Sequence, residues 1–177
     1  NQKLFIKWGG VGDTCKNEYS YIKYFYEKDN SFFIKPWFYK CNNDAKCIVT
    51  DYVEGTSLDR LLQDGSLSAK EKDNIIIQLG QIADILKESK FVHRDIRPAN
   101  FILTSDKKLK LIDMQFAVDS THYKECRFVR KNPRKIEPLG DKYAYKKYMW
   151  DDMYSISKVI EEIGYSDKTK HIYEKIK

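Results

Sequence analysis

The stretch that decides the fold is Phe91-Val92-His93-Arg94-Asp95-Ile96-Arg97-Pro98-Ala99-Asn100, followed by Leu109-Lys110-Leu111-Ile112-Asp113. Asp95 and Asn100 are five residues apart, and Asp113 comes thirteen residues later. Phosphoryl transfer needs such a set of side chains. One acid orients and deprotonates the attacking hydroxyl, and two oxygen ligands hold Mg²⁺ against the phosphates. The spacing therefore predicts a phosphoryl-transfer site on one loop and the strands that follow it.

His93-Arg94-Asp95 with Asn100 resembles the catalytic loop of the protein-kinase-like superfamily. The resemblance implies that Asp95 is the catalytic base and Asn100 a metal ligand. Asp113 takes the place of the metal-binding Asp of the Asp-Phe-Gly motif. Arg97 takes the place where protein Ser/Thr kinases carry a Lys, and it would stabilise the transferred phosphoryl group through a planar guanidinium.

The same resemblance assigns roles near the N-terminus. Lys7 lies in an early strand, where the family keeps the Lys that binds the α- and β-phosphates. Glu18 begins the following helix and is similar to the ion-pair partner of that Lys. Without the resemblance, the two residues would be interpreted as a solvated strand Lys and a Glu favoured by the helix dipole.

The segment from Val49 to Gly55 resembles the hinge between the two lobes of a kinase. Thr50 would be the gatekeeper residue, and the backbone of Asp51, Tyr52 and Val53 would contact adenine. Further on, Asp152 resembles the Asp that supports the catalytic loop from helix F, although a helix cap is the alternative. His93 is interpreted as a structural hydrogen-bonding residue. The resemblance covers roughly residues 4–163.

Local patterns predict the remaining elements. Ser68 and Glu71 form a capping box, and an apolar residue recurs every three to four positions after it, which predicts a long helix. Two apolar runs around the polar residues 104–108 predict a hairpin. The other predicted elements are strands at 4–8 and 47–53, an edge strand at 32–39, and helices at 17–26, 57–63 and 151–163.

These observations predict an α+β fold with the two lobes of a protein kinase. The N-terminal lobe, residues 1–50, would be truncated or minimal, with part of a sheet and one helix. Residues 51–55 would form the hinge. The mainly helical C-terminal lobe, residues 56–177, would end shortly after helix F.

The sequence departs from the kinase pattern in three places. No glycine-rich loop precedes Lys7, so either the N-terminus was cut or this family lacks that lid. The Gly9 to Gly12 segment comes after the strand and is interpreted as a turn. Asp113-Met114-Gln115 replaces Asp-Phe-Gly, and there is no Ala-Pro-Glu segment. These departures favour a small-molecule kinase over a regulated protein kinase.

A narrower resemblance points to an acceptor class. Arg97-Pro98, the segment from Leu139 to Tyr143 and the segment from Trp150 to Ser155 resemble small bacterial kinases of lipopolysaccharide and envelope-glycan synthesis, such as sugar and heptose kinases. The main hypothesis is therefore an ATP- and Mg²⁺-dependent kinase that phosphorylates a hydroxyl of a bacterial glycan or small molecule. The alternatives are a minimal protein Ser/Thr kinase and a kinase-fold binding module with little catalysis.

Positive charge is concentrated in one segment. The chain has 177 residues and a net charge of +6, and Lys124 to Lys135 carries six basic residues against Glu125. The segment would either hold an anionic or glycan acceptor, close to an acidic membrane surface, or form a solvated loop. Nucleic acid is a poor third partner, because no binding motif accompanies the charge.

The four cysteines are Cys15, Cys41, Cys47 and Cys126. Their spacing matches no zinc pattern, and we interpret them as reduced thiols of a cytoplasmic protein, with contact at the inner membrane through the basic segment. A Cys41–Cys47 disulfide is the alternative. The sequence does not predict the oligomeric state.

Overall fold

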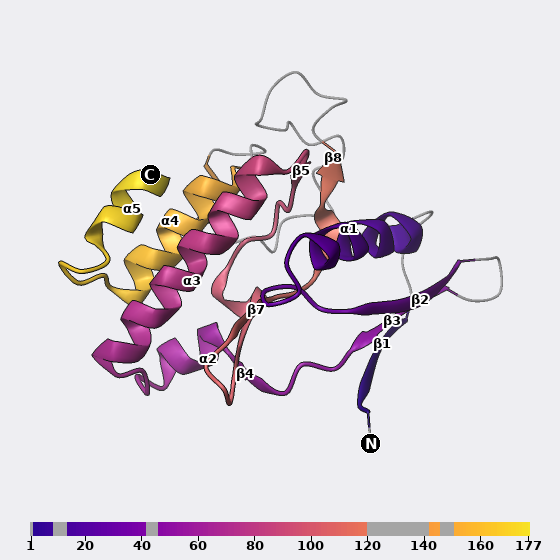
Figure 1. Cartoon of the computed structure of the whole chain (residues 1–177), viewed down its shortest axis with the longest axis horizontal. Helices are drawn as coiled ribbons and strands as arrows, with labels where there is room; N and C mark the ends of the chain where they lie inside the picture. The colour runs from indigo at the N-terminus through magenta and orange to yellow at the C-terminus, as the bar shows by residue number, and fades with distance from the viewer. Residues whose placement is uncertain (1, 9–13, 42–45, 120–141, 146–150) are drawn as a thin grey trace.

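A three-stranded antiparallel sheet forms one end of the molecule, in the order β1–β3–β2. The computed structural model describes residues 2–8, 14–41, 46–119, 142–145 and 151–177. Strands β1 (Leu4–Trp8) and β2 (Pro36–Cys41) both pair with the central β3 (Lys46–Asp51) (Figure 1). Four consecutive residues of β3 are buried, whereas β1 is largely exposed. The predicted strand at 4–8 is confirmed.

The segment before β2 corrects one sequence prediction. The edge strand predicted from Phe32 begins only at Pro36, at the sheet edge where a missing N–H is tolerated. Phe32 and Phe33 belong to the core instead. The Phe32 carbonyl accepts a hydrogen bond of 2.9 Å from the Leu111 N–H. This contact joins the first sheet to the hairpin that follows the predicted catalytic loop.

Helix α1 (Thr14–Lys28) lies alongside this sheet and is longer than the predicted 17–26 (Figure 1). Glu18, Ile22 and Phe25 are buried and lie on one face, since they are four and three residues apart. Phe25 stacks on Phe33 with ring centroids 5.0 Å apart. A buried Glu on an apolar helix face requires a cationic partner.

A second sheet, in the order β4–β6–β7, contains the predicted hairpin. Strands β6 (Phe101–Thr104) and β7 (Leu109–Leu111) pair as expected, and β4 (Gly55–Ser57) pairs with β6. Here the strand prediction for 47–53 is wrong at its end, because β3 stops at Asp51 and Gly55 begins a new strand. A Cβ on Gly55 would lie 2.4 Å from the Leu103 carbonyl oxygen, so the strands approach this closely only with glycine.

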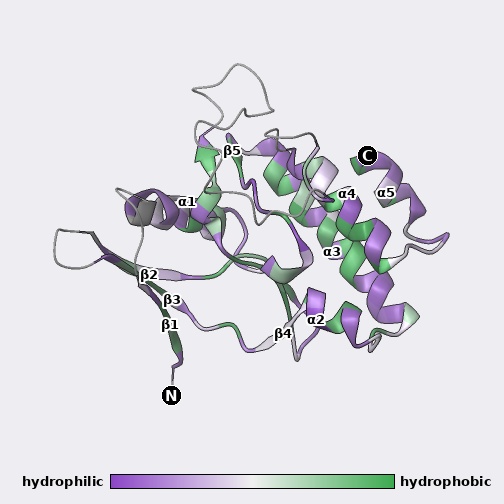
Figure 2. Cartoon of the chain, turned by 180° about the vertical axis from the view of Figure 1, so that it is seen from behind, coloured by the Kyte–Doolittle hydropathy of each residue, from purple (hydrophilic) through white to green (hydrophobic). Residues whose placement is uncertain are grey.

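The other end of the molecule is helical. It contains α2 (Leu58–Gln63), α3 (Ala69–Glu88), α4 (Asp152–Ile163) and α5 (Lys170–Ile176). The capping box before α3 is confirmed: the Glu71 N–H donates to Ser68 Oγ at 3.3 Å, and the Ser68 N–H donates to the Glu71 carboxylate at 3.0 Å. Figure 2 shows hydrophobic and hydrophilic stripes along α3 and α4. The sequence analysis did not predict α5.

Two short strands and two 3-10 helices surround Asp95, Asn100 and Asp113 in the sequence. Strand β5 (Phe91–Val92) pairs with β8 (Val118–Asp119), and the 3-10 helices η1 (Pro98–Asn100) and η2 (Met114–Phe116) lie between them in sequence. Together the elements make an α+β fold. Within the described ranges, none of the helices combines the length and apolar character needed to cross a membrane.

Candidate active site

The loop from β5 to η1 is anchored to helix α4 through Asp152. The Asp152 carboxylate accepts hydrogen bonds from the backbone N–H groups of His93 (2.7 Å) and Arg94 (3.1 Å). Asp152 is buried, and burial raises its pKa to about 6 although both N–H groups favour the ionised form. Asp151 caps the helix, because its side chain accepts hydrogen bonds from the first turn. The structure thus agrees with Asp152 as a support for the loop.

His93 is fully buried beside this anchor. Its Nδ1 accepts a hydrogen bond of 3.2 Å from the Asp95 N–H, and its Nε2 lies 3.3 Å from the Ile112 carbonyl oxygen. This hydrogen-bond pattern assigns the ring proton to Nε2. Burial lowers the pKa of His93 to about 4, so the ring is neutral near pH 7. His93 therefore joins the loop to the strand that leads to Asp113, as a structural residue.

Asp95 lies at the centre of the loop and is only 2% exposed. Its Oδ2 accepts a hydrogen bond of 2.8 Å from the Asn100 side chain. Its Oδ1 lies 3.0 Å from Arg97 Nε, within ion-pair distance, but makes no aligned hydrogen bond with any described residue. Burial raises the pKa of Asp95 to about 6, although Asn100 and Arg97 favour the ionised form. At neutral pH this is an ionised carboxylate with one oxygen available to accept a proton.

Asn100 and Asp113 are brought together by the hairpin. The Asn100 backbone carbonyl accepts a hydrogen bond of 3.0 Å from the Ile112 N–H, so Asp113 follows the residue that is bonded to Asn100. The Asn100 side-chain N–H group donates to the Asp95 backbone carbonyl at 2.7 Å as well as to its carboxylate. The carboxamide oxygen of Asn100 therefore remains as a potential ligand atom.

Two residues of the site hold a left-handed backbone conformation, Arg94 (φ 66°) and Asp113 (φ 64°). Such a conformation costs of order 1–3 kcal/mol in a residue other than glycine and persists only where neighbouring contacts maintain it. Arg94 Nε donates to the Phe116 carbonyl oxygen at 2.5 Å, and Asp113 accepts from the Gln115 N–H at 3.4 Å. The strain lies at the two places where the chain turns toward the site.

Lys7 connects the first sheet to this loop. Its Nζ lies 2.9 Å from Glu18 Oε1 and 2.7 Å from Asp113 Oδ1. Burial alone lowers the pKa of Lys7, but Asp113 and Glu18 outweigh it, so the pKa lies above its usual value. Burial raises the pKa of Glu18, opposed by Lys7. The Lys7–Glu18 pair predicted from the resemblance is present, and Asp113 joins it.

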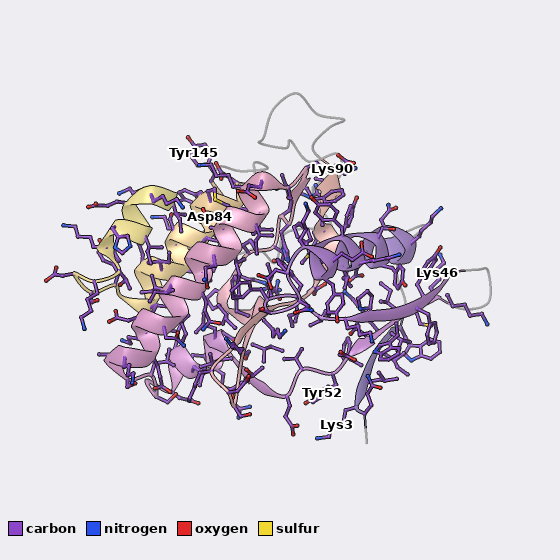
Figure 3. The ribbon with its side chains drawn as sticks, in the orientation of Figure 1. Lys3, Lys46, Tyr52, Asp84, Lys90 and Tyr145 are labelled. Carbon is purple, nitrogen blue, oxygen red and sulfur yellow. The ribbon has the colours of Figure 1, made fainter. Side chains whose placement is uncertain are left out.

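A cavity of about 490 Å³ opens between the two sheets, beside Lys7. Lys7, Glu18 and Asp113 line it with charged side chains, and the 50–53 segment lines it as well. Figure 3 shows Tyr52 on the connection between the first sheet and β4. The remaining lining is mostly apolar and includes Phe5, Ile22, Ile34, Ile48, Ile102 and Ile112. A cavity that offers a lysine ammonium group beside a mostly apolar lining suits a phosphorylated ligand with a planar base.

The donor atoms beside this cavity fit a magnesium ion. Asn100 offers a carboxamide oxygen and Asp113 a carboxylate, both hard ligands of the kind that Mg²⁺ prefers together with phosphate oxygens. No group of three His, Cys, Asp or Glu side chains gathers elsewhere in the described ranges as a closed metal site would require. The ion would therefore be held jointly by these two side chains and by the ligand's phosphates.

Several sequence predictions fall outside the described residues. They are the turn at 9–12, the basic segment 124–135 and the segment 139–141 with the Trp at 150. Cys47 is buried and free, in agreement with a reduced thiol. The division into 1–50, 51–55 and 56–177 stays a prediction.

The sequence analysis overlooked Phe5 and Arg94 as residues of the site. Phe5 lines the cavity because it is two residues before Lys7 on the same strand and therefore on the same face. That alternation is visible in the sequence and could have identified it. Arg94 gave no comparable signal, because its left-handed conformation depends on contacts with Phe116 and Asp152 that are distant in sequence.

Comparison with known proteins places this geometry in a family. Residues 13–170 match the family described as protein kinase domain. The probable serine/threonine-protein kinase CPE1738 of Clostridium perfringens is 29% identical over 147 residues, which cover 75% of this chain and 21% of that protein. Serine/threonine-protein kinase PknB of Mycobacterium leprae is 27% identical over 123 residues, 66% of this chain and 19% of that protein.

A plant relative extends the same similarity. Serine/threonine-protein kinase TIO of Arabidopsis thaliana is 27% identical over 119 residues, which cover 66% of this chain and 9% of that protein. This chain thus spans about a fifth or less of the length of these three relatives. The family match includes the anchored loop, Asn100, Asp113 and the predicted hinge segment 51–55, and it begins after Lys7. The chain therefore belongs to the protein kinase domain family.

Proposed function

We propose that this protein transfers the γ-phosphate of ATP to a serine or threonine hydroxyl of a protein. The observation that carries the proposal has two parts. Asp113 joins the Lys7–Glu18 pair in the lining of the cavity. The Asp95–Asn100 pair is held beside Asp113 by the backbone hydrogen bond between Asn100 and Ile112. The names of the similar proteins support a protein acceptor.

The nucleotide would bind with its base near the hinge and its phosphates near Lys7. Thr50 and the segment to Val53 line the cavity at the end of β3, where backbone groups can meet the edge of adenine. Lys7 lies at the other end, where its charge would attract the α- and β-phosphates. Glu18 would hold Lys7 when Asp113 turns to the metal.

The acceptor hydroxyl would be activated by Asp95. The oxygen Oδ1 is free of aligned hydrogen bonds, and Asn100 fixes the orientation of the carboxylate through Oδ2. A pKa of about 6 leaves the group ionised at neutral pH yet basic enough to accept a proton. Arg97, at 3.0 Å from Oδ1, would stabilise the negative charge of the transferring phosphoryl group. Bound Mg²⁺ would neutralise charge between the β- and γ-phosphates.

The test is a transfer assay with labelled ATP and two panels of acceptors. One panel contains Ser/Thr proteins and peptides, and the other contains plain and phosphorylated core sugars of lipopolysaccharide. We expect label on serine or threonine. Label on sugars alone would support the glycan kinase that the sequence suggested and overturn the protein acceptor.

A binding measurement accompanies the assay. ATP with Mg²⁺ should raise the melting temperature of the protein, and Asp113→Asn should remove most of that increase, because the carboxylate ligand is lost. If ATP gives no shift and no acceptor is labelled, the protein is a binding module of the kinase fold and the proposal is wrong.

A further inference from the structure

The first residue of β5, Phe91, contacts helix α1 through its aromatic ring. The rings of Tyr21 and Tyr24 on α1 each meet the Phe91 ring edge-on, with centroids 4.8 Å apart. A third ring of the helix, that of Phe25, lies 6.0 Å from it. Aromatic pairs in this arrangement attract each other beyond what the burial of their surface contributes. Helix α1 is thus held against a single side chain that precedes the catalytic loop by two residues.

The backbone of Phe91 is fixed to the same part of the molecule as the catalytic loop. Its N–H donates a hydrogen bond of 3.1 Å to Ser89 Oγ at the end of α3, and it pairs with Asp119 in the β5–β8 ladder. Two residues later, the His93 N–H donates to the Asp152 carboxylate that anchors the loop. The buried Phe91 ring therefore gives α1 a fixed point of contact beside the loop.

Glu18 lies close to this contact on α1. It precedes Tyr21 by three residues, which is about 4.5 Å along the axis of an α-helix. Over so short a distance the helix moves as one body, so a displacement of α1 at Phe91 also displaces Glu18. Lys7 Nζ lies 2.9 Å from Glu18 Oε1. A shift of about 1 Å would bring this ion pair to the limit of its range.

We infer that Phe91 is a positioning residue for nucleotide binding, because its ring fixes α1 where Glu18 can hold the Lys7 ammonium group. The inference rests on the proposed use of ATP. Asp113 also pairs with Lys7, but it would leave Lys7 on binding Mg²⁺, and Glu18 would then hold the ammonium group. Phe91 does not line the nucleotide cavity, so it would act through Glu18.

Other contacts hold α1 on the side of the first sheet. Tyr19 contacts Tyr39 of β2 with ring centroids 4.9 Å apart, and Phe25 stacks on Phe33. The helix packs on η2 as well. Without the Phe91 ring, α1 would stay attached to the sheet but could tilt relative to the catalytic loop. The protein should then remain folded while its affinity for ATP falls.

The first measurement is the affinity of Phe91→Leu for ATP with Mg²⁺, by calorimetry. Leucine keeps a buried apolar side chain but removes the ring. We expect affinity to fall by about three- to tenfold, since one or two ring contacts contribute that much. The loss should not exceed that in Glu18→Gln, through which Phe91 acts. The KM for ATP should rise, while the KM for a peptide acceptor should stay near that of the wild type.

A double-mutant cycle separates positioning from a merely structural role. If Phe91 acts through Glu18, adding Phe91→Leu to Glu18→Gln should change ATP affinity by less than about twofold, whereas independent effects would multiply. Tyr24→Leu should weaken binding in the same way, and Tyr24→Phe, which keeps the ring, should restore it. Since Tyr24 is only half-buried, Tyr24→Leu supplies the same cycle if Phe91→Leu does not fold.

Tyr173→Leu is the matched control. Tyr173 is a buried aromatic residue of α5 that stacks on Tyr165 with ring centroids 4.6 Å apart, at the helical end of the molecule. Its replacement also removes a ring from a packed pair, yet ATP affinity should stay at the wild-type value. Circular dichroism shows that each variant is folded.

The outcomes separate the inference from the proposed function. If the wild type binds ATP but the losses multiply in the double variant, the inference is wrong while the proposed function stands. The same holds if Phe91→Leu and Tyr24→Leu both keep the wild-type affinity. If the wild type binds no ATP, the proposed function fails and the inference fails with it.

Discussion

Asp95 and Lys7 reach the same site from two differently built regions. Asp95 belongs to a buried loop that is fixed by a hydrogen bond donated by Asn100 and by hydrogen bonds that His93 Nδ1 and the Asp152 carboxylate accept. Lys7 belongs to the edge strand β1. Trp8, the next residue on this strand, is 70% exposed. Apart from its pairing with β3, β1 is tied to the rest of the site chiefly by the side-chain contacts of Lys7 with Glu18 and Asp113.

This difference in anchoring predicts different effects of substitution in the loop and on β1. In the loop, support of the fold and chemistry depend on the same hydrogen bonds, so substitutions there should change stability and activity together. On β1, the fold depends mainly on the pairing with β3, so the Lys7 side chain can be changed at smaller cost to stability. The predictions below test this separation, from the largest expected effect to the smallest.

Asp152→Ala should have the largest effect on stability. It leaves the buried N–H groups of His93 and Arg94 without a partner, which should lower the free energy of unfolding by about 2–4 kcal/mol. Phosphate transfer should fall as well, because the loop loses its anchor. Urea unfolding measures the first effect and a transfer assay the second.

Asp151→Ala is the control for this prediction. It removes the helix cap and should cost about 1 kcal/mol with little effect on transfer. Equal effects of the two substitutions would contradict the role of Asp152 as the anchor of the loop.

Lys7→Met should act mainly on the nucleotide. Loss of the ammonium group should weaken ATP binding by about 10- to 100-fold, since a charge-assisted contact to phosphate contributes that much. The free energy of unfolding should change less than in Asp152→Ala. Calorimetry of ATP binding checks the affinity. Glu18→Gln leaves Lys7 paired with Asp113 and should weaken ATP binding less than Lys7→Met does. A larger loss of ATP affinity in Glu18→Gln would contradict the role of the Lys7 ammonium group as the phosphate contact.

Asp95→Asn should stabilise the protein at neutral pH, by about 1–2 kcal/mol. The folded pKa of Asp95, about 6, is above the usual value of 3.8, so ionisation at pH 7 costs folding free energy that the amide avoids. The gain should shrink as pH falls below about 6 and disappear only below 3.8, where the carboxyl becomes neutral in both states. Thermal unfolding of both proteins between pH 4 and 8 measures it. A gain that grows at low pH would contradict the burial of this carboxylate.

Ser68→Ala should have the smallest effect. It removes half of the capping box of α3, far along the chain from both regions, and should cost about 1 kcal/mol. Transfer activity at a temperature well below unfolding should be unchanged. Loss of activity in the folded variant would show that stability and chemistry are not separable in the way the comparison requires.

Sequence alone predicted the elements whose signals are local. The capping residues Ser68 and Glu71 with their apolar stripe marked α3, and the polar turn at 104–108 marked the hairpin. The short β4 and α5 escaped because neither has a periodic pattern of sufficient length. The end of β3 was misplaced because Gly55 was interpreted as a stop, whereas its contact with Leu103 makes it the start of a strand.

The site was predictable only in part, because only some of its residues are close to one another in the sequence. The spacing of Asp95, Asn100 and Asp113 is local and indicated the chemistry, and the resemblance to kinases added Lys7 and Glu18. The ion pair between Lys7 and Asp113 joins residues that are 106 positions apart. A cavity of about 520 Å³ beside the loop combines residues of α2, α3, the loop, Tyr143 and α4, and no pattern in the sequence connects these places.

The most direct test of the account is phosphate transfer by Asp95→Asn. Asp95 Oδ1 is the proposed proton acceptor, so the rate of transfer from ATP should fall by about 10²–10⁴-fold while ATP affinity stays near that of the wild type. In the wild-type protein the rate should fall as pH drops below about 6, because the carboxylate then becomes protonated. A variant that transfers phosphate at the wild-type rate would show that Asp95 is not the base and would contradict the central claim.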